Sequence, residues 1–137
     1  MGLEKQAKKD LQPGLSAEVE TIVGEKETAA HHGSGSIPVY ATPALVALME
    51  NAAVRALVGH LPTGHTTVGG QIDVRHLAAT PVGLKVRARA ELTEVHGRKL
   101  NFHIQAWDEV DQIGEANHSR FIVNEEAFMT RVNAKAR

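Results

Sequence analysis

Three polar residues, Thr42, Glu50 and His76, stand where the periodicity of the surrounding sequence calls for apolar side chains. Glu50 interrupts the apolar side of the segment TPALVALMENAAVRALV, and His76 ends the alternating run VGGQIDVRH. A carboxylate or an imidazole that faces a core costs free energy unless it is paired. The imidazole, with a reference pKa of about 6.5, can also change protonation state near neutrality. Ionisable groups in such positions indicate a functional site.

Each of these residues also has a purely structural interpretation. Thr42 precedes Pro43, as a helix N-cap often does. Glu50 can lie at the edge of a helix, where it meets solvent or pairs with Arg55. His76 can be a core histidine that hydrogen-bonds to the backbone. The three residues alone leave these interpretations open.

The composition is that of an ordinary folded domain. Of the 137 residues, 42% are apolar and 23% are charged, which suits one domain with one core. The net charge of -1 gives no overall attraction to nucleic acid or to anionic membranes. The basic strand face of Lys85, Arg87 and Arg89 lacks interleaved aromatic residues and is typical of a solvated face. The absence of cysteine excludes disulfides, thiolate metal sites and a cysteine nucleophile.

The N-terminus indicates no targeting signal. MGLEKQAKKDLQPG is charged and lacks the apolar stretch of a signal peptide, and no segment approaches the roughly 20 apolar residues of a membrane span. We therefore expect a cytoplasmic protein in which residues 1–137 form a single domain and residues 1–13 are a flexible N-terminal segment. The eight histidines show no metal-ligand spacing, so no metal site is expected.

The first half of the chain predicts a strand, a loop and a helix. Residues 15–23 alternate between apolar and polar side chains, as in a half-buried strand. Residues 25–41 have no sustained period, which indicates a loop that can begin with a short strand and can act as a flap. Thr42-Pro43 resembles an N-cap followed by proline at the first helical position. Apolar residues then recur at helical spacing over about 17 residues.

The second half predicts an antiparallel sheet that is covered on one side. The strand segments are residues 67–79, 84–95, 99–108 and 113–123. In the first of them, alternation places Val68, Ile72 and Val74 on the inward face. From Leu84 onward, apolar and polar residues alternate strictly, so one face is buried and the other is solvated. Asn124 caps a short closing helix.

A strand, a long buried helix and four further strands in a meander follow the order of the hot-dog fold. In this α+β fold a curved antiparallel sheet wraps around a long central helix. Residues 15–133 resemble the hot-dog thioesterases of the fluoroacetyl-CoA thioesterase type. The resemblance is carried by the order and spacing of ATPALVALMENAAVRAL, VGGQIDVRHLAATPVG, ELTEVHGRKLNF, DEVDQIGEANHSR and FMTRVNAKAR. It implies this fold with a short C-terminal helix.

The resemblance also assigns site residues. Thr42, Glu50 and His76 take the catalytic positions, and Gly69-Gly70 and Arg120 take substrate-binding positions. Glu50 would act as general base or nucleophile, and His76 would orient Glu50 or water and protonate the leaving group. Thr42 would hydrogen-bond the carboxylate or the substrate, and the Gly69 amide would approach the thioester carbonyl. From the residues alone, Gly69-Gly70 can equally mark a bulge, and Arg120 can be an ordinary surface cation.

One distance constrains this site. Along a continuous helix, Thr42 and Glu50 are separated by about 12 Å of rise, which prevents direct contact. Either the chain bends so that Thr42 precedes the regular helix, or the two groups touch opposite ends of the reacting centre. Family members form dimers in which the sheet continues across the interface and the site lies between protomers. We therefore expect a homodimer or a higher homo-oligomer.

The implied function is hydrolysis of an acyl-CoA thioester with no cofactor, coenzyme A being part of the substrate. Residues 33–37 are mostly small and residue 51 is Asn51, where the fluoroacetyl-specific enzyme has aromatic residues. A short or medium acyl group is therefore expected in place of a strict fluoroacetyl preference. Two alternatives stay open: a hot-dog dehydratase or hydratase acting on acyl thioesters, and a non-catalytic acyl-CoA binding protein.

Overall fold

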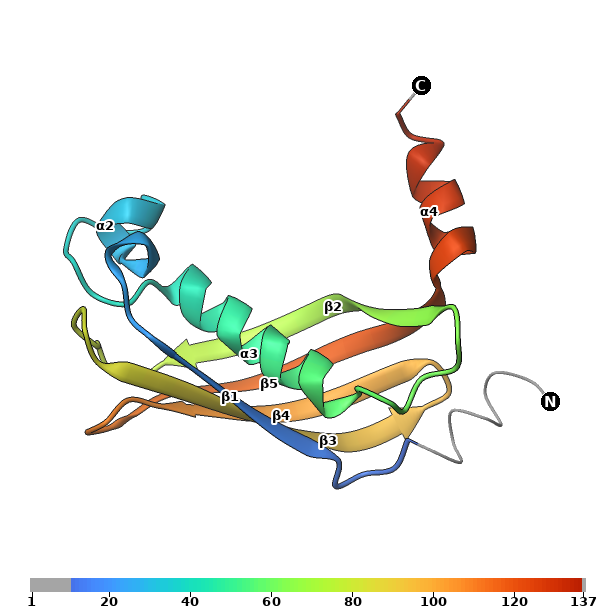
Figure 1. Cartoon of the computed structure of the whole chain (residues 1–137), viewed down its shortest axis with the longest axis horizontal. Coiled ribbons are helices and arrows are strands. Elements are labelled where there is room, and N and C mark those ends of the chain that lie inside the picture. Colours follow the sequence, from blue (N-terminus) through green and yellow to red (C-terminus); the bar gives the residue numbers. More distant parts are fainter. Residues whose placement is uncertain (1–10, 137) are drawn as a thin grey trace.

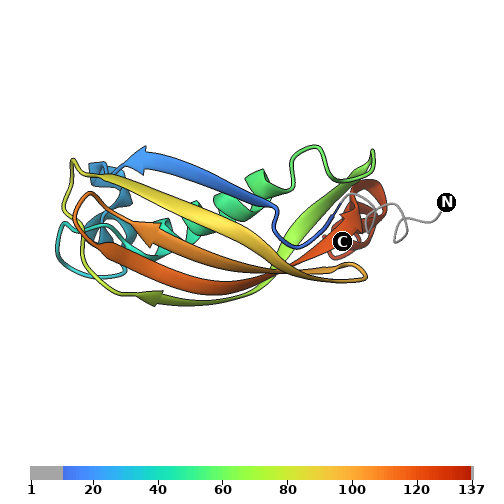
Figure 2. The same ribbon diagram turned by 90° about the horizontal axis from the view of Figure 1, so that it is seen from below.

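The computed structural model describes residues 11–136, in which one five-stranded antiparallel sheet curves around a long helix (Figures 1 and 2). The strand order is β1-β3-β4-β5-β2, so β1 and β2 are the edge strands. The elements are β1 (Ser16–Ile22), η1 (Glu25–Glu27), α2 (Ala29–His32), α3 (Thr42–Ala56), β2 (His65–His76), β3 (Lys85–His96), β4 (Lys99–Trp107), β5 (Gln112–Asn124) and α4 (Glu125–Asn133). This architecture confirms the predicted curved sheet, central helix and short C-terminal helix.

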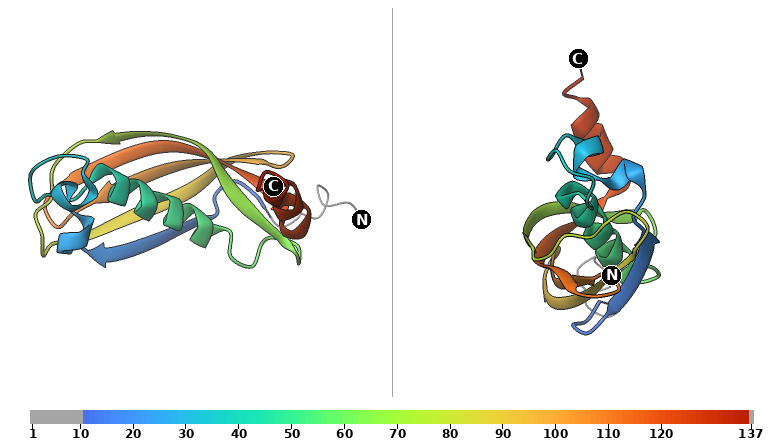
Figure 3. Two further views of the ribbon diagram at one scale, coloured as in Figure 1. Left: turned by 90° about the horizontal axis from the view of Figure 1, so that it is seen from above. Right: turned by 90° about the vertical axis from the view of Figure 1, so that its left-hand side faces the viewer.

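Helix α3 lies in the concave face of the sheet, where it forms one side of the core (Figure 3). Its buried residues recur at helical spacing and are Leu45, Met49, Ala52, Ala53 and Ala56. The prediction that Thr42 is the N-cap is wrong, because Ala41 occupies that position and makes no side-chain capping bond. Thr42 is instead the first helical residue, followed by Pro43. Its hydroxyl is therefore available to a partner outside the helix.

The alternation predicted for β3 is confirmed. Its inward side chains are fully buried and are Val86, Ala88, Ala90 and Leu92. The basic side chains on the other face meet acids of β1: Lys85 Nζ lies 3.7 Å from Glu20 Oε1, and Arg87 NH1 lies 3.3 Å from Glu18 Oε2. Arg89 NH1 lies 3.4 Å from Glu91 Oε1 of its own strand, so all three basic residues of this face have an acidic partner.

A β-bulge changes the inward face of β2. The register with β5 shifts between Gly69 and Gln71, and an extra residue in one strand reverses the alternation beyond it. Val68 therefore pairs with the half-exposed Phe121, whereas Gly69 pairs with the buried Arg120. The prediction that Val68 faces inward is wrong, because the bulge turns its neighbours Thr67 and Gly69 toward α3 instead.

The segment predicted as a loop with a possible short strand contains two helical turns, η1 and α2. The Thr28 side chain caps α2 by accepting a hydrogen bond from the His31 amide at 3.2 Å. The amide of Tyr40 donates to the carbonyl of Thr80 at 2.8 Å. These bonds hold the segment over the end of the sheet where α3 begins and β2 ends (Figure 1).

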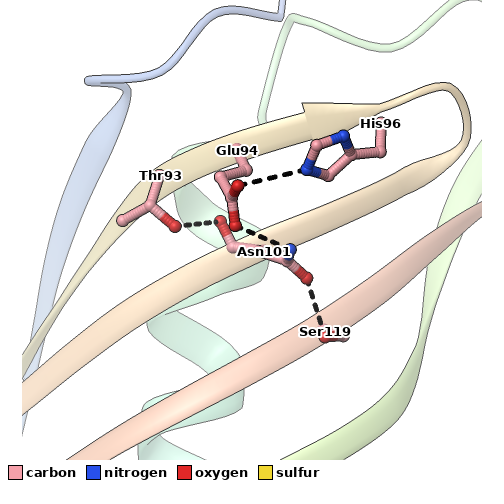
Figure 4. Close-up of polar contacts among 5 residues, drawn as sticks. All are labelled: Thr93, Glu94, His96, Asn101 and Ser119. Atoms are coloured by element: carbon pink, nitrogen blue, oxygen red, sulfur yellow. Dashed lines mark hydrogen bonds and ion pairs between the residues drawn. The ribbon is translucent and has the colours of Figure 1, made fainter.

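The outer face of the sheet carries a polar network next to a second bulge, between Leu92 and Glu94 of β3 (Figure 4). We call it the outer network; its members are Thr93, Glu94, His96, Asn101 and Ser119. The Asn101 amide donates to Glu94 Oε1 at 3.2 Å, and the Ser119 hydroxyl donates to Asn101 Oδ1 at 2.8 Å. Glu94 also lies 3.2 Å from His96 Nε2.

The two ends of the described chain differ. Residues 1–10 of the predicted flexible segment lie outside the described residues, but Leu11, inside that predicted range, is buried in the core with 2% of its surface exposed. At the other end, the predicted cap of α4 is confirmed, because Asn124 Oδ1 accepts a hydrogen bond from the Ala127 amide at 2.9 Å. Helix α4 projects away from the sheet (Figure 1).

Candidate active site

The structure brings Thr42 and His76 into direct contact. Thr42 Oγ1 lies 2.8 Å from His76 Nδ1, which joins the first turn of α3 to the last residue of β2. His76 Nε2 is buried and has no hydrogen-bond partner among residues 11–136. Burial lowers the pKa of His76 below its usual value. The result is an imidazole that is neutral near pH 7 and has one ring nitrogen free for a substrate or another residue.

A cavity of about 370 Å³ opens beside this pair. Most of its walls are small or apolar, and they come from the α2 segment, the start of α3 and the chain after β2. The lining residues are Ala29, Ser34, Val39, Tyr40, Thr42, His76, Leu77, Ala78 and Ala79. The segment predicted to act as a flap therefore contributes one wall of a cavity whose polar corner is Thr42 and His76.

A second cluster forms around Glu50, in the middle of α3. Glu50 Oε2 lies 3.5 Å from Arg120 NH1 of β5. The Arg120 side chain is only 8% exposed, whereas that of Glu50 is 40% exposed. A Cβ atom at Gly69 would lie 2.8 Å from Glu50 Oε2 and 3.4 Å from Arg120 NH1. Glycine at this position of the bulged strand is therefore what lets the carboxylate and the guanidinium lie against β2.

Arg120 is held by two residues that the sequence did not single out, Thr67 and His118. Arg120 Nε donates to Thr67 Oγ1 at 2.9 Å, and NH2 donates to the Thr67 carbonyl at 3.1 Å. Arg120 NH1 lies 3.2 Å from His118 Nε2. Burial lowers the pKa of Arg120, and the charge of the nearby Glu50 offsets only part of this decrease. We call Glu50, Thr67, His118 and Arg120 the inner network.

The sequence gives a signal for His118 but none for Thr67. His118 and Arg120 share the inward parity of β5 with apolar residues, so the pattern of the strand could have indicated both. Thr67 could not be found in this way, because simple alternation along β2 turns it outward and only the bulge brings it inward.

Within one chain, the predicted trio is therefore divided between two places. Thr42 belongs to the continuous helix α3, so the alternative in which the chain bends before the helix is wrong. Glu50 lies about 12 Å further along the axis, with Arg120 and Gly69. Gly70 is placed differently again, because a Cβ atom there would overlap the ring of Phe121 on the outer face. The chain thus presents two partial sites, one at His76 and one at Glu50.

Two kinds of feature are not found in the described part of the chain. Among residues 11–136, no group of three or more histidine, aspartate or glutamate side chains is arranged to hold a metal ion. No helix in the same range is long and apolar enough to cross a membrane.

Comparison with known proteins agrees with the fold. A family model described as fluoroacetyl-CoA-specific thioesterase matches residues 23–126. The fluoroacetyl-CoA thioesterase of Streptantibioticus cattleyicolor is 44% identical over 97 residues, which span 71% of this chain and 70% of the relative. A solved fluoroacetyl-CoA thioesterase superposes with a TM-score of 0.85 at 37% identity, covering 91% of this chain and 97% of that one. A Thermus thermophilus member of the thioesterase superfamily superposes with a TM-score of 0.82 at 29% identity, covering 90% of this chain and 94% of that one. The chain is a hot-dog protein that belongs to the fluoroacetyl-CoA-specific thioesterase family.

Proposed function

We propose that this acyl-CoA thioesterase hydrolyses a short or medium acyl-CoA with Thr42, Glu50 and His76 as its reacting groups. The observation that carries the proposal is the pair of partial sites. His76 offers a buried ring nitrogen without a partner in the described chain, and Glu50 offers a half-exposed carboxylate beside Arg120. His76 can serve as the acid and Glu50 as the base, so the two partial sites together provide both groups that general acid-base catalysis needs.

A second copy of the chain can join the two partial sites. Strand β2 is an edge of the sheet, and edge strands of this kind pair readily with another chain. Gly69, next to Glu50, and His76 lie seven positions apart on β2. If two β2 strands pair antiparallel about Asp73, and Gly70 is left out of the ladder as it is in the pairing with β5, Gly69 lies opposite His76 of the partner subunit. We therefore propose a homodimer with two sites, each combining Glu50 of one protomer with the partner's Thr42 and His76.

In such a site the reaction needs only groups that this chain carries. Glu50, which lies in an ion pair with Arg120, takes a proton from water as that water attacks the thioester carbonyl carbon, or attacks this carbon directly to give a mixed anhydride that water then hydrolyses. The Gly69 amide supports the charge that develops on the carbonyl oxygen. The neutral ring of His76 takes up the proton that the water releases and passes it to the departing thiolate as the carbon–sulfur bond breaks, with Thr42 fixing the orientation of the ring. The products are a carboxylic acid and coenzyme A as its free thiol.

The cavity beside His76 supports a broad acyl specificity. Its lining includes Ala29, Ser34, Ala78 and Ala79, together with the mostly buried Tyr40. Small side chains leave room for methylene groups that an aromatic lid would exclude. We propose that the acyl group lies here and that chains longer than two carbons are accepted.

The proposal is tested by measuring the free thiol that is released from a series of straight-chain acyl-CoAs and from fluoroacetyl-CoA. The assay compares wild type with two matched glutamate variants. Glu50→Gln should lower kcat by about a hundredfold or more, the usual contribution of an acid-base group. Glu115→Gln is the control, because Glu115 is as exposed as Glu50 but lies on the outer face, paired with His103. No thiol release from any acyl-CoA, or equal activity of the Glu50 variant and wild type, would refute the proposal.

A further inference from the structure

His118 is buried in β5, with 3% of its surface exposed, and both of its ring nitrogens have partners. Nδ1 lies 2.7 Å from the carbonyl oxygen of Gln71. A carbonyl can only accept, so Nδ1 must carry the hydrogen. A neutral ring then has its lone pair on Nε2, where it accepts from Arg120 NH1 at 3.2 Å. The two contacts together fix both the tautomer and the orientation of the ring.

The bulge in β2 supplies the carbonyl that anchors His118. Gln71 follows directly after the register shift with β5, where the regular ladder is interrupted. Its carbonyl oxygen is bound by the Nδ1–H of an inward-facing side chain. The irregularity that turns Gly69 toward Glu50 therefore also fixes the histidine behind Arg120.

The Arg120 guanidinium is constrained on every side. Nε and NH2 both bind Thr67, through its hydroxyl and its carbonyl. NH1 is shared between His118 Nε2 and Glu50 Oε2, at 3.2 and 3.5 Å. Thr67 and His118 thus hold the plane of the guanidinium, and Glu50 meets the one nitrogen that this arrangement directs toward α3.

We propose that His118 and Thr67 are positioning residues for the thioesterase reaction, which hold Arg120 so that its NH1 sets the orientation of the Glu50 carboxylate. The inference rests on the proposed function, in which Glu50 is a reacting group. His118 acts as a neutral hydrogen-bond acceptor, and Thr67 acts through its hydroxyl. Neither residue touches the reacting atoms.

The surroundings of His118 keep it in the required state. The groups that face it are Arg120 on its own strand, Glu50 on α3, the Gln71 carbonyl on β2 and the Phe102 ring on β4, 6.2 Å away. Burial lowers the pKa of His118, and the charge of Arg120 lowers it further, against opposing effects of Gln71 and Glu50. A protonated His118 would direct an N–H group at a cation, and the hold on Arg120 would be lost.

Two pairs of variants test the proposal. His118→Phe removes the acceptor, whereas His118→Gln can place an amide oxygen near the position of Nε2. Thr67→Val removes the hydroxyl at constant shape, whereas Thr67→Ser keeps it. The controls are His103→Gln and Thr66→Val, outer-face neighbours that do not contact Arg120. We expect kcat to fall roughly tenfold or more in His118→Phe and Thr67→Val, since each loses a hydrogen bond to a charged group. Activity should recover substantially in the Gln and Ser variants.

A second readout does not depend on turnover. Nitrogen-15 NMR of the histidine rings should show His118 as the Nδ1–H tautomer at pH 7, and the Arg120 Nε–H signal should exchange slowly with solvent. The Arg120 signal should broaden or vanish in Thr67→Val. This variant keeps the test decisive if His118→Phe does not fold.

The outcomes separate this proposal from the proposed function. If wild type releases thiol and Glu50→Gln does not, while folded His118→Phe and Thr67→Val keep wild-type kcat, positioning is refuted and the function stands. A His118 ring in the Nε2–H tautomer would also refute positioning. If Glu50→Gln is as active as wild type, the proposed function fails, whatever the NMR shows of Arg120.

Discussion

The inner and outer networks use the same kinds of side chain on opposite faces of one sheet, and each lies beside a β-bulge. In the inner network, Arg120 and His118 are almost completely buried. In the outer network, the side chains of Glu94 and His96 are 57% and 62% exposed. Water therefore screens the outer contacts, and each outer group can exchange its partner for solvent at little cost. The buried inner groups, Arg120 and His118, cannot replace a lost partner with water, so the loss of one leaves the other unsatisfied.

The largest effect should follow from removing the centre of the inner network. Arg120→Ala leaves His118 Nε2 and the Thr67 hydroxyl without their partner and removes the counter-ion of Glu50. We expect a loss of about 2–3 kcal/mol in the free energy of unfolding and nearly complete loss of thiol release. Urea unfolding and the thiol assay measure the two effects. A stability equal to that of wild type would show that the inner network is as replaceable as the outer one.

A smaller effect is expected where a methyl group is added inside the network. Gly69→Ala would place a Cβ atom 2.8 Å from Glu50 Oε2 and 3.5 Å from His118 Cε1. Glu50 is at a half-exposed position and can rotate away, so stability should change by less than about 1 kcal/mol. Because the displaced carboxylate is a reacting group in the proposed function, kcat should fall at least tenfold. Wild-type kcat would show that the carboxylate does not need its place against β2.

The pH dependence of stability should reveal the buried histidines. The pKa values of His118 and His76 are both lowered, chiefly by burial. An unfolded chain binds protons near pH 6.5, whereas the folded chain resists protonation until a lower pH. The free energy of unfolding should therefore fall as the pH drops below about 6.5. His118→Gln should make this decline shallower, and an unchanged slope would mean that His118 does not resist protonation.

The smallest effect should come from the outer network. The hydrogen bond from His96 is the main cause of a lowered pKa at Glu94, with Asn101 contributing. Stability that depends on this carboxylate is present above its unfolded pKa and is lost as the pH falls below it. Because more than half of the Glu94 side chain is exposed to solvent, we expect Glu94→Gln to leave the urea midpoint and kcat within experimental error, in low and in high salt. A clear shift in either would remove the contrast between the two faces.

The sequence predicted strand β3 correctly but misplaced residues of strand β2 and the role of Thr42, and each result has a physical reason. Strand β3 could be predicted in detail, because strict alternation from Leu84 to Thr93 reflects one buried and one solvated face. Strand β2 could be located, and its predicted inward residues Ile72 and Val74 do pack against the core. The inward residues before the bulge could not be predicted, since one extra residue there reverses the parity of Val68. Likewise, Thr42 was expected to cap α3, yet its hydroxyl contacts His76, thirty-four positions along the chain. Local patterns predicted the elements, whereas contacts between distant elements decided the details of the site.

The bulge at Gly69 and Gly70 makes the site unusually sensitive to the length of the chain. Deletion of a single residue there would give β2 an unbroken alternation, and by the rules of strand geometry the sheet would become more regular. The same deletion would keep Thr67 and Gly69 facing α3, because Gly69 already lies opposite Arg120 and Gln71 opposite Ser119. It would, however, return the Gln71 carbonyl to the regular ladder and withdraw it from His118. A descendant of this protein could thus keep the fold and the inward residues of β2 and still lose the anchor of His118 in one step. Among its relatives, the spacing between the glycines and the histidine of this strand should indicate whether a histidine at this place in β5 can be anchored.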